Sequence, residues 1–285
     1  MMLSLKQLLD GHIGSGIKPS SLPGYLKLIQ KKVEFYFPEG DPRAVVANLS
    51  SEELLKRMHE LREEIKERGI FFESFLPIWS DIGIDKDEIF MDVIRIRCVP
   101  DKFHENTNAK SVAYIHRDPW YANPQCQINL WIPIYSVAKG SGFRIYQEYF
   151  NQPIPNNSHT FDYNEWLLLG GFQSNHTPPG KIRIFPSPNY NPDETNVIDI
   201  HGDEGELNIF SSHHLHGTSP NHSGLARFTL EVRFVLQSHL ENRMGPNKLD
   251  NRSKGSTLRH MYDIKNNKSV SESLIKYYED FFVPP

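Results

Sequence analysis

Residues 125–135, QCQINLWIPIY, constrain the fold most because they alternate polar and apolar side chains. A period of two residues predicts a β-strand, whose successive side chains point to opposite faces. One face carries Gln125, Gln127, Asn129 and Trp131, and the other carries Cys126, Ile128, Leu130 and Ile132. We expect the apolar face to pack against helices and the polar face to line a cavity. The alternative is the ordinary arrangement, in which the polar face meets water.

Further stretches of the chain have the patterns of strands and helices. Strands are predicted at residues 90–99, 143–146, 181–185, 207–210 and 227–234, where β-branched and aromatic residues are frequent. Helices are predicted at residues 25–37, 50–68 and 271–282. Because 285 residues suit one large domain, the sequence predicts a single α+β domain, with an all-β core and flanking helices.

The helix at residues 50–68 has the clearest boundaries. Ser50 and Glu53 have the spacing of a capping box, and Gly69 is expected to end the helix. Its apolar stripe, which we expect to pack on the outer face of a sheet, consists of Leu54, Met58, Leu61 and Ile65.

The single domain, residues 1–285, divides into three parts by composition. Residues 1–89 form an N-terminal helical flank, residues 90–236 form the core, and residues 237–285 form a C-terminal helical extension. The core contains an insert at residues 150–195 that is rich in Asn and Pro. Long irregular inserts are commonly lids or binding loops, so we expect this one to shape a substrate pocket.

Two short segments carry residues that can bind a metal. His116 and Asp118 are two residues apart, so on an extended chain both side chains lie on one side and can meet one ion. A further histidine would complete a set of two histidines and one carboxylate, which leaves metal positions open. A second His-x-Asp pair, His201 and Asp203, lies in a Gly-rich turn and suits a metal less well.

The histidine that completes the set comes from the segment HHLHGTSPNHS at residues 213–223. We favour His216, which precedes a glycine after the strand at 207–210, over His213 and His214 at the strand end. On the strand at 227–234, Arg227 and Thr229 share a face. A guanidinium and a hydroxyl together form a good clamp for a carboxylate.

The order of these motifs resembles that of the Fe(II)/2-oxoglutarate dioxygenases, most of all their phytanoyl-CoA dioxygenase-like branch. In that branch the distal histidine lies in an H-G-x-x-P-N-x-S type segment, which residues 216–223 match as HGTSPNHS. The resemblance covers about residues 90–236 and implies that the core is a double-stranded β-helix, a jelly-roll barrel of the cupin type.

The resemblance also implies the ligands and the chemistry. His116, Asp118 and His216 would hold Fe(II), and Arg227 with Thr229 would bind the distal carboxylate of 2-oxoglutarate. Such an oxygenase uses O2, forms succinate and CO2, and is commonly assayed with ascorbate. Because related halogenases lack the carboxylate, Asp118 favours hydroxylation, desaturation or oxidative cyclisation of a small-molecule substrate.

The remaining candidates surround these ligands. Gln127 and Asn129 are expected to contact 2-oxoglutarate or substrate. The aromatic residues expected to wall the substrate pocket are Tyr114, Trp120, Tyr121 and Trp131. Trp120 could instead anchor a surface loop. Arg95, Arg97 and Arg233 could also meet an acidic group, although Arg95 and Arg97 suit a solvated strand face equally well.

Composition limits the partners and the compartment. A net charge of −4 and a pI near 6.4 give no basic patch for nucleic acid. No stretch approaches the roughly eighteen apolar residues that span a bilayer, and the first residues lack the pattern of a signal peptide. The cysteines, Cys98 and Cys126, make no disulfide framework. We therefore expect a cytoplasmic enzyme without membrane or nucleic-acid partners, and the oligomeric state stays open.

Two other functions use the same ligands. A JmjC-type protein hydroxylase would bind the cosubstrate acid through a lysine on an earlier strand, for which Lys181 is available, although the Arg227 and Thr229 pair disfavours this reading. A non-oxidative cupin-like module would hold zinc or manganese, because three protein ligands and a water also suit zinc.

Overall fold

The computed structural model describes residues 3–67, 69–105, 114–169, 183 and 185–282. Its helices are α1 (Leu5–Leu9), α2 (Leu22–Tyr36), α3 (Pro42–Val45), α4 (Ser51–Lys66), α5 (Ile70–Asp81), α7 (Tyr163–Leu168), α8 (Gln237–Glu241) and α9 (Glu272–Glu279). Its strands are β1 (Gly14–Ile17), β2 (Ile89–Met91), β3 (Arg95–Val99), β4 (Ile128–Pro133), β5 (Phe143–Tyr146), β6 (Val197–Ile200), β7 (Leu207–Ser211), β8 (His216–Thr218), β9 (Arg227–Leu236) and β10 (Tyr262–Asp263).

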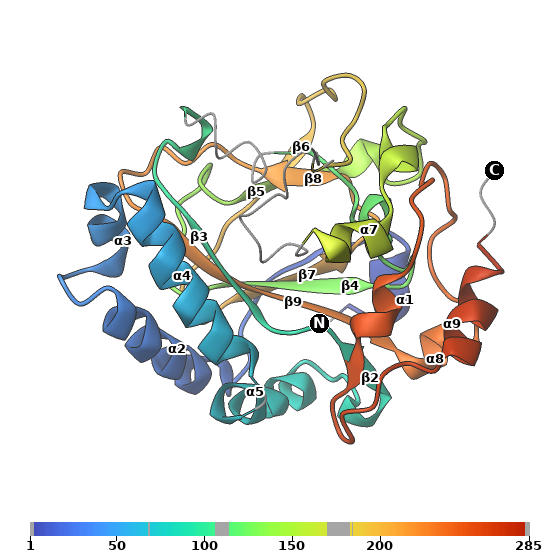
Figure 1. The fold of residues 1–285 in the computed structure, drawn as a ribbon, viewed down its shortest axis with the longest axis horizontal. Helices are drawn as coiled ribbons and strands as arrows, with labels where there is room; N and C mark the ends of the chain where they lie inside the picture. The colour runs from blue at the N-terminus through green and yellow to red at the C-terminus, as the bar shows by residue number, and fades with distance from the viewer. Residues whose placement is uncertain (1–2, 68, 106–113, 170–182, 184, 283–285) are drawn as a thin grey trace.

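The strands form two antiparallel sheets. The larger has the order β1-β7-β4-β9-β2-β10, and β3 also pairs with β9. The smaller has the order β6-β5-β8. Figure 1 shows α2, α4 and α5 beside the larger sheet and the smaller sheet on its other side. The prediction of a β core with flanking helices is confirmed. The expected closed barrel is not formed by the strand pairing of the described residues, which gives two separate sheets.

The two faces of β4 and β9 differ as the alternation predicts. Their even-numbered residues, including Ile128 and Leu230, are buried in the main core with residues of α2, α4 and α5. The odd-numbered residues face the other way, toward the smaller sheet, where Trp131 packs with Phe143. Because Gln127 is fully buried, the alternative in which the polar face meets water is wrong. This inward polar face is where the site is built.

The predicted strand at residues 90–99 is interrupted. Asp92 separates β2 from β3: its side chain accepts a hydrogen bond from the Val93 amide at 2.7 Å and pairs with Arg95. A short side chain that binds its neighbouring backbone competes with the strand ladder. The break therefore follows from a local hydrogen bond that the alternating pattern does not reveal.

Helix α4 begins as predicted but ends differently. Ser50 caps it by accepting from the Glu53 amide at 3.1 Å, whereas the Glu53 carboxylate pairs with Arg57 at 2.8 Å, so the capping box is only half formed. Gly69 does not end α4; it is the N-cap of α5, which sequence analysis missed. The two flanks also contribute strands, since β1 and β10 both join the larger sheet. No helix of the described residues is long and apolar enough to cross a membrane.

Candidate metal centre

A backbone bridge joins the two motif segments. The His116 amide donates to the His216 carbonyl at 2.8 Å, and the His216 amide donates to the His116 carbonyl at 2.9 Å. A second contact, from the Asp118 amide to the Ser212 carbonyl at 3.2 Å, fixes the following residues. His216 lies in β8, a strand of the smaller sheet. The bridge therefore brings together segments that are far apart in the chain.

The three residues His116, Asp118 and His216 offer one ligand atom each, and these atoms all lie within 4.8 Å of one another. The His116 Nδ1 lies 3.0 Å from the Tyr114 carbonyl, and the His216 Nδ1 lies 2.9 Å from the His214 carbonyl. A carbonyl oxygen can only accept, so each Nδ1 carries the proton and each Nε2 keeps its lone pair. Both rings are thereby oriented as metal ligands require.

The Asp118 carboxylate is held from one side. Its Oδ2 accepts from the Asn129 Nδ2 at 2.5 Å and from the Gln127 Nε2 at 3.3 Å. Its Oδ1 lies 3.5 Å from the His116 Nε2 and faces the other ligands. Gln127 and Asn129 were expected to contact 2-oxoglutarate or substrate, but in this structure their amides bind Asp118. They leave Oδ1 as the oxygen available to a metal.

The charges around the centre favour ligand forms at neutral pH. Burial alone would raise the pKa of Asp118, but the nearby Arg233 and both histidines bring that pKa far below its usual value. Burial, together with the charge of His116, lowers the pKa of His216 to about 4. Carboxylate and neutral imidazole are the forms that bind metal, so the donor set fits a divalent ion.

The rival histidines have other surroundings. The His213 Nδ1 lies 3.1 Å from the Gln125 Oε1, and its Nε2 lies 2.9 Å from the Arg117 Nη1. His214 is fully buried, with its ring beside Phe150 at 4.6 Å between centroids. His201 lies 3.2 Å from the Asp199 carboxylate. None of the three belongs to a group of metal-binding side chains among the residues that the structure places.

Arg117, the middle residue of the His-Arg-Asp motif, was not singled out from the sequence. It is completely buried and donates to the carbonyls of Tyr149, Gln152 and His213. Its Nε lies 3.4 Å from the Asp250 carboxylate. A buried guanidinium needs such partners, and here they tie the metal-binding segment to residues 149–152. The sequence does not predict this burial, because arginine is almost never fully buried unless it is paired.

Asp250 is a second residue that the sequence did not reveal. Its carboxylate accepts from the Trp120 indole at 2.8 Å and from the Ile154 amide at 2.9 Å. Trp120 itself is completely buried in an aromatic cluster with Tyr121 and Leu215. Trp120 therefore fixes the loop that follows Asp118. No local pattern around residue 250 signals this role.

Arg227 and Thr229 lie together on the inward face of β9. Arg227 donates through Nη1 to the Ser141 carbonyl at 2.8 Å and to the Gly142 carbonyl, and its Cζ lies 6.0 Å from the centre of the Trp131 ring. The Arg227 Nε and the Thr229 Oγ1 are buried, and neither has a hydrogen-bond partner among the residues that the structure describes. Burial lowers the pKa of Arg227 to about 10. Unsatisfied buried donors are costly, so this pair suits a bound carboxylate.

Gly142 permits this arrangement. A Cβ at Gly142 would lie 1.7 Å from the Ile200 carbonyl oxygen on β6. Only glycine lets the start of β5 approach β6 so closely, and this places the Gly142 carbonyl against Arg227.

Arg233 lies beside the triad, a position that the sequence did not predict. Its Nη2 is 3.9 Å from the Asp118 Oδ1 and 3.9 Å from the Glu231 Oε2. Arg227 is six residues away on the same strand, or about 20 Å along the backbone. Arg97, on the neighbouring β3, pairs with Glu231 at 2.6 Å. Lys181, the alternative anchor, lies outside the described residues.

The predicted aromatic wall is partly assembled around the triad. The Tyr121 ring stands edge-on to His116 at 5.1 Å between centroids, and its hydroxyl donates to the Pro186 carbonyl at 3.2 Å. Tyr114 stacks on Phe185 at 5.4 Å. Trp131 packs on the Arg227 side of the centre, as described above. Of the predicted wall residues, Tyr121 contacts a ligand ring directly, and a substrate pocket walled by the others stays a prediction.

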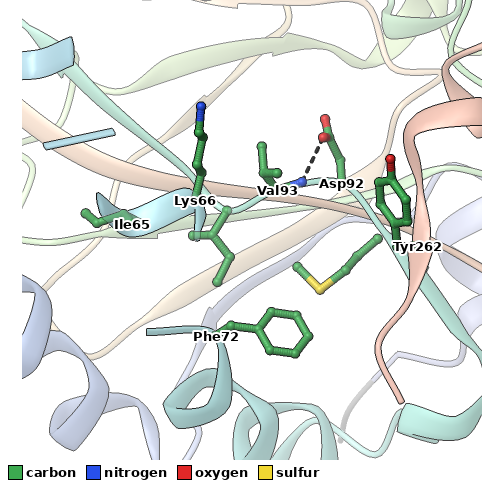
Figure 2. A pocket seen from close by; sticks show the side chains of 8 residues that line it. Ile65, Lys66, Phe72, Asp92, Val93 and Tyr262 are labelled. Carbon is green, nitrogen blue, oxygen red and sulfur yellow. Dashed lines mark hydrogen bonds between the residues drawn. The ribbon is translucent and has the colours of Figure 1, made fainter. Parts of the chain in front are cut away.

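Two cavities among the described residues lie elsewhere. Figure 2 shows one of about 40 Å³ between Phe72, Asp92 and Tyr262, which is the size of one or two water molecules. The other, of about 250 Å³, is lined mainly by apolar residues from α1, β1 and the end of α5. Neither includes a member of the triad, so we assign the centre from its side chains and their hydrogen bonds.

Comparisons with known proteins leave the family open. No protein-family model matches the chain, and no curated protein matches it. Similar solved structures include the apo form of the non-heme monooxygenase ThoJ, with a TM-score of 0.45 and 11% identity over 97% of this chain and 94% of that one. EvdO2 from Micromonospora carbonacea var. aurantiaca, complexed with 2-oxoglutarate, has a TM-score of 0.45 and 11% identity over 83% and 93%.

A third similar structure is the epimerase SnoN in complex with Fe3+, alpha ketoglutarate and nogalamycin RO, with a TM-score of 0.40 and 10% identity over 81% and 83% of the two chains. Because all of these TM-scores lie below 0.5, we draw no functional conclusion from them.

The geometry predicts which histidines bind metal. His116→Ala or His216→Ala should weaken Co(II) or Fe(II) binding by at least about a hundredfold, because each removes one of three protein ligands. His201→Ala, which alters the other His-x-Asp pair, should bind as the wild type does. Isothermal titration of the metal-free proteins measures this, and unchanged affinity in either of the first two variants would refute the assigned centre.

The amides that hold Asp118 should also affect metal affinity. Asn129→Ala removes the 2.5 Å bond to the Asp118 Oδ2, and loss of such a supporting bond typically lowers metal affinity by about 10–100-fold. The exposed Asn164 provides the control, because Asn164→Ala should leave affinity unchanged. Equal affinities for the two variants would show that the amide does not position the carboxylate.

Proposed function

We propose that this protein is a non-haem Fe(II)- and 2-oxoglutarate-dependent oxygenase. Its substrate would be a small-molecule metabolite or biosynthetic intermediate, oxidised at a C–H bond by hydroxylation, desaturation or oxidative cyclisation. The two sheets would correspond to the halves of a jelly-roll core of the phytanoyl-CoA dioxygenase-like type. We place the substrate between these sheets, beside the triad.

One observation carries the proposal. A set of two histidines and one carboxylate, which suits iron with open positions, accompanies a buried arginine and threonine. In the described part of the chain, the Arg227 Nε and the Thr229 Oγ1 have no hydrogen-bond partner. A metal alone would explain the first feature and leave the second unexplained. A diacid that reaches from the metal to Arg227 and Thr229 would explain both.

The residues of the chain would act by binding and orientation. His116, His216 and the Asp118 Oδ1 would hold the iron, while the amides of Gln127 and Asn129 keep the carboxylate turned toward it. Arg227 and Thr229 would bind the distal carboxylate of 2-oxoglutarate. When bound, iron and 2-oxoglutarate supply the redox chemistry in which O2 and the 2-oxo acid yield oxidised substrate, succinate and CO2.

Burial would let the protein exclude water from the reaction. Asp118 is 2% exposed and Thr229 is completely buried, and the aromatic residues around His116 cover one side of the centre. In such surroundings fixed hydrogen-bond donors act more strongly on a bound anion than they do in water. Asp118 also occupies the ligand position that halogenases leave open, which favours oxygenation over halogenation.

Turnover of 2-oxoglutarate in the absence of substrate tests the proposal. The metal-free protein, mixed with Fe(II), ascorbate, O2 and labelled 2-oxoglutarate, should release labelled succinate above the background of Asp118→Ala. Mass spectrometry measures the product. If metal binds and no succinate forms even slowly, the protein is better described as a non-oxidative cupin-like metal module.

The predicted diacid clamp has its own test. Arg227→Ala should raise the 2-oxoglutarate concentration needed for half-maximal binding by about 10–100-fold, because a charge-assisted hydrogen bond contributes about 1.5–3 kcal/mol. Metal affinity should change little, since Arg227 is not a ligand. Arg227→Lys retains the charge but not the planar guanidinium group, so its 2-oxoglutarate requirement should fall between those of the wild type and Arg227→Ala. An unchanged requirement in Arg227→Ala would move the clamp to Arg233.

A further inference from the structure

A second group of arginines lies on the inward face of the larger sheet, on the same pair of strands, β3 and β9, that carries Arg227 and Thr229. Arg95 and Arg97 of β3 pair in register with Glu231 and Thr229 of β9. Their side chains therefore share the face that carries Arg233. These arginines play no part in the proposed binding of metal or 2-oxoglutarate.

Ion pairs connect this group to the metal centre. Arg233 approaches Asp118 and Glu231 at 3.9 Å each, and Arg97 holds the other oxygen of Glu231 at 2.6 Å. Exposure increases along this row, from 2% for the Asp118 side chain through 12% for Arg233 to 36% for Arg97. The row therefore leads outward from the metal ligand to a guanidinium that solvent can reach.

Positive charge is in excess here. The nearby arginines are Arg62, Arg95, Arg97 and Arg233, and the nearby carboxylates are Asp92, Asp118 and Glu231. Arg62, from α4, donates to the Ile96 carbonyl at 3.1 Å, and it has no carboxylate within 4.0 Å among the described residues. Burial lowers the pKa of Arg62, and the charge of Arg97 lowers it further. A bound metal would add two more positive charges.

The forks of two arginines stay available. Within the described part of the chain, Arg233 has no side-chain hydrogen bond of 3.5 Å or less, and the closest approach of Arg97 to Glu231 is through Nε. A guanidinium presents five N–H donors, so each retains donors for a further acceptor. A purely structural ion pair would more often use the whole fork, as Arg57 does with Glu39.

Two tyrosines, Tyr121 and Tyr163, lie near enough to these arginines for their charges to act on the hydroxyl groups. Burial raises the pKa of Tyr121, and the charges that act on its hydroxyl include those of Arg97 and Arg233. Burial likewise raises the pKa of Tyr163 to about 12, under the influence of Arg95 and Arg233. Tyr121 also contacts His116, with 5.1 Å between the ring centroids, so one of these tyrosines lies beside the triad.

We propose that the substrate is an anion whose carboxylate or phosphate is bound by Arg97 and Arg233, on either side of Glu231 between the 2-oxoglutarate clamp and Asp118. This proposal rests on the function proposed above, because it names the substrate class of the same centre. The two arginine positions would then hold two acids at once, the cosubstrate at Arg227 and the substrate at Arg97 and Arg233. Asp118, one of the residues that would hold the metal, lies beside the Arg233 end of this anchor.

Calorimetry with matched probes tests this anchor without turnover. Full-length protein is titrated with phenylacetate, phenyl phosphate and the neutral phenylacetamide, first without metal and then with Zn(II) and 2-oxoglutarate. At least one anion should bind about tenfold or more tightly than the amide, and the tighter anion distinguishes a carboxylate from a phosphate site. Equal binding of both anions and the amide overturns the proposal.

Substitutions of single arginines show where the anionic probe binds. Arg97→Gln should weaken anion binding about tenfold, whereas Arg144→Gln, which removes an arginine paired with Glu194 in the smaller sheet, should have no effect. Arg227→Gln should retain the probe. Wild-type affinity in Arg97→Gln overturns the proposal, as does a loss in Arg227→Gln that equals the loss in Arg97→Gln, because the probe would then occupy the cosubstrate clamp.

If Arg97→Gln does not fold, a milder substitution at the same position tests the proposal. Arg97→Lys keeps the charge but loses the fork, so it should weaken anion binding several-fold; unchanged binding overturns the proposal. These measurements need neither iron nor O2. If the protein forms succinate but binds no anion preferentially, the substrate anchor is refuted and the oxygenase proposal stands. If it binds the anion at Arg97 but forms no succinate, the oxygenase proposal is refuted and the anion site stands.

Discussion

The two backbone hydrogen bonds between His116 and His216 are the constraint on which the site depends. They pair a segment after β3 with β8, a strand of the smaller sheet, and so align two imidazoles contributed by distant parts of the chain. Each ring is then turned by a bond from Nδ1 to a carbonyl two residues earlier, at Tyr114 and His214. Without this pairing the two histidines and Asp118 would not converge, because no other strand pairing joins these segments among the residues described.

Around this pairing the larger sheet supplies a buried polar face, which is unusual for a strand in the middle of a core. Buried charges are tolerated only when they are paired or hydrogen-bonded. Here Asp118 is held by two amides, and the alternating charges of Arg233, Glu231 and Arg97 extend from it. The apolar faces of the same strands pack on α2, α4 and α5, so the helices stabilise a sheet whose other face carries polar and charged side chains.

Some polar groups on that face are incompletely satisfied. An unpartnered buried donor costs about 1–3 kcal/mol, and the Arg227 Nε and Thr229 Oγ1 are two such atoms side by side on one strand face. The free forks of Arg97 and Arg233 differ because solvent reaches them. The first pair is buried, as the proposed cosubstrate clamp requires, whereas the second is partly exposed, as the proposed substrate anchor requires.

Several features were predictable because their signals are local. Alternation in residues 125–135 and 227–234 identified both central strands and the face that points inward, and Ser50 and Ser271 marked the starts of α4 and α9. The features that were missed depend on side-chain hydrogen bonds or on partners distant in the chain. The break at Asp92 depends on its own side chain, Gly69 begins α5 instead of ending α4, and the buried roles of Arg117 and Asp250 exist only once residues 149–154 fold against them.

The sequence by itself determined the candidate ligands, because the two-residue spacing of His116 and Asp118 and the alternation of β9 are properties of an extended chain. Only the tertiary structure decided which histidine joins them and what Gln127 and Asn129 contact. Those outcomes depend on strand pairing across about a hundred residues and on which polar group is nearest after burial. A buried polar group bonds to the partner nearest to it in space, and residue spacing along the chain does not predict which partner that is.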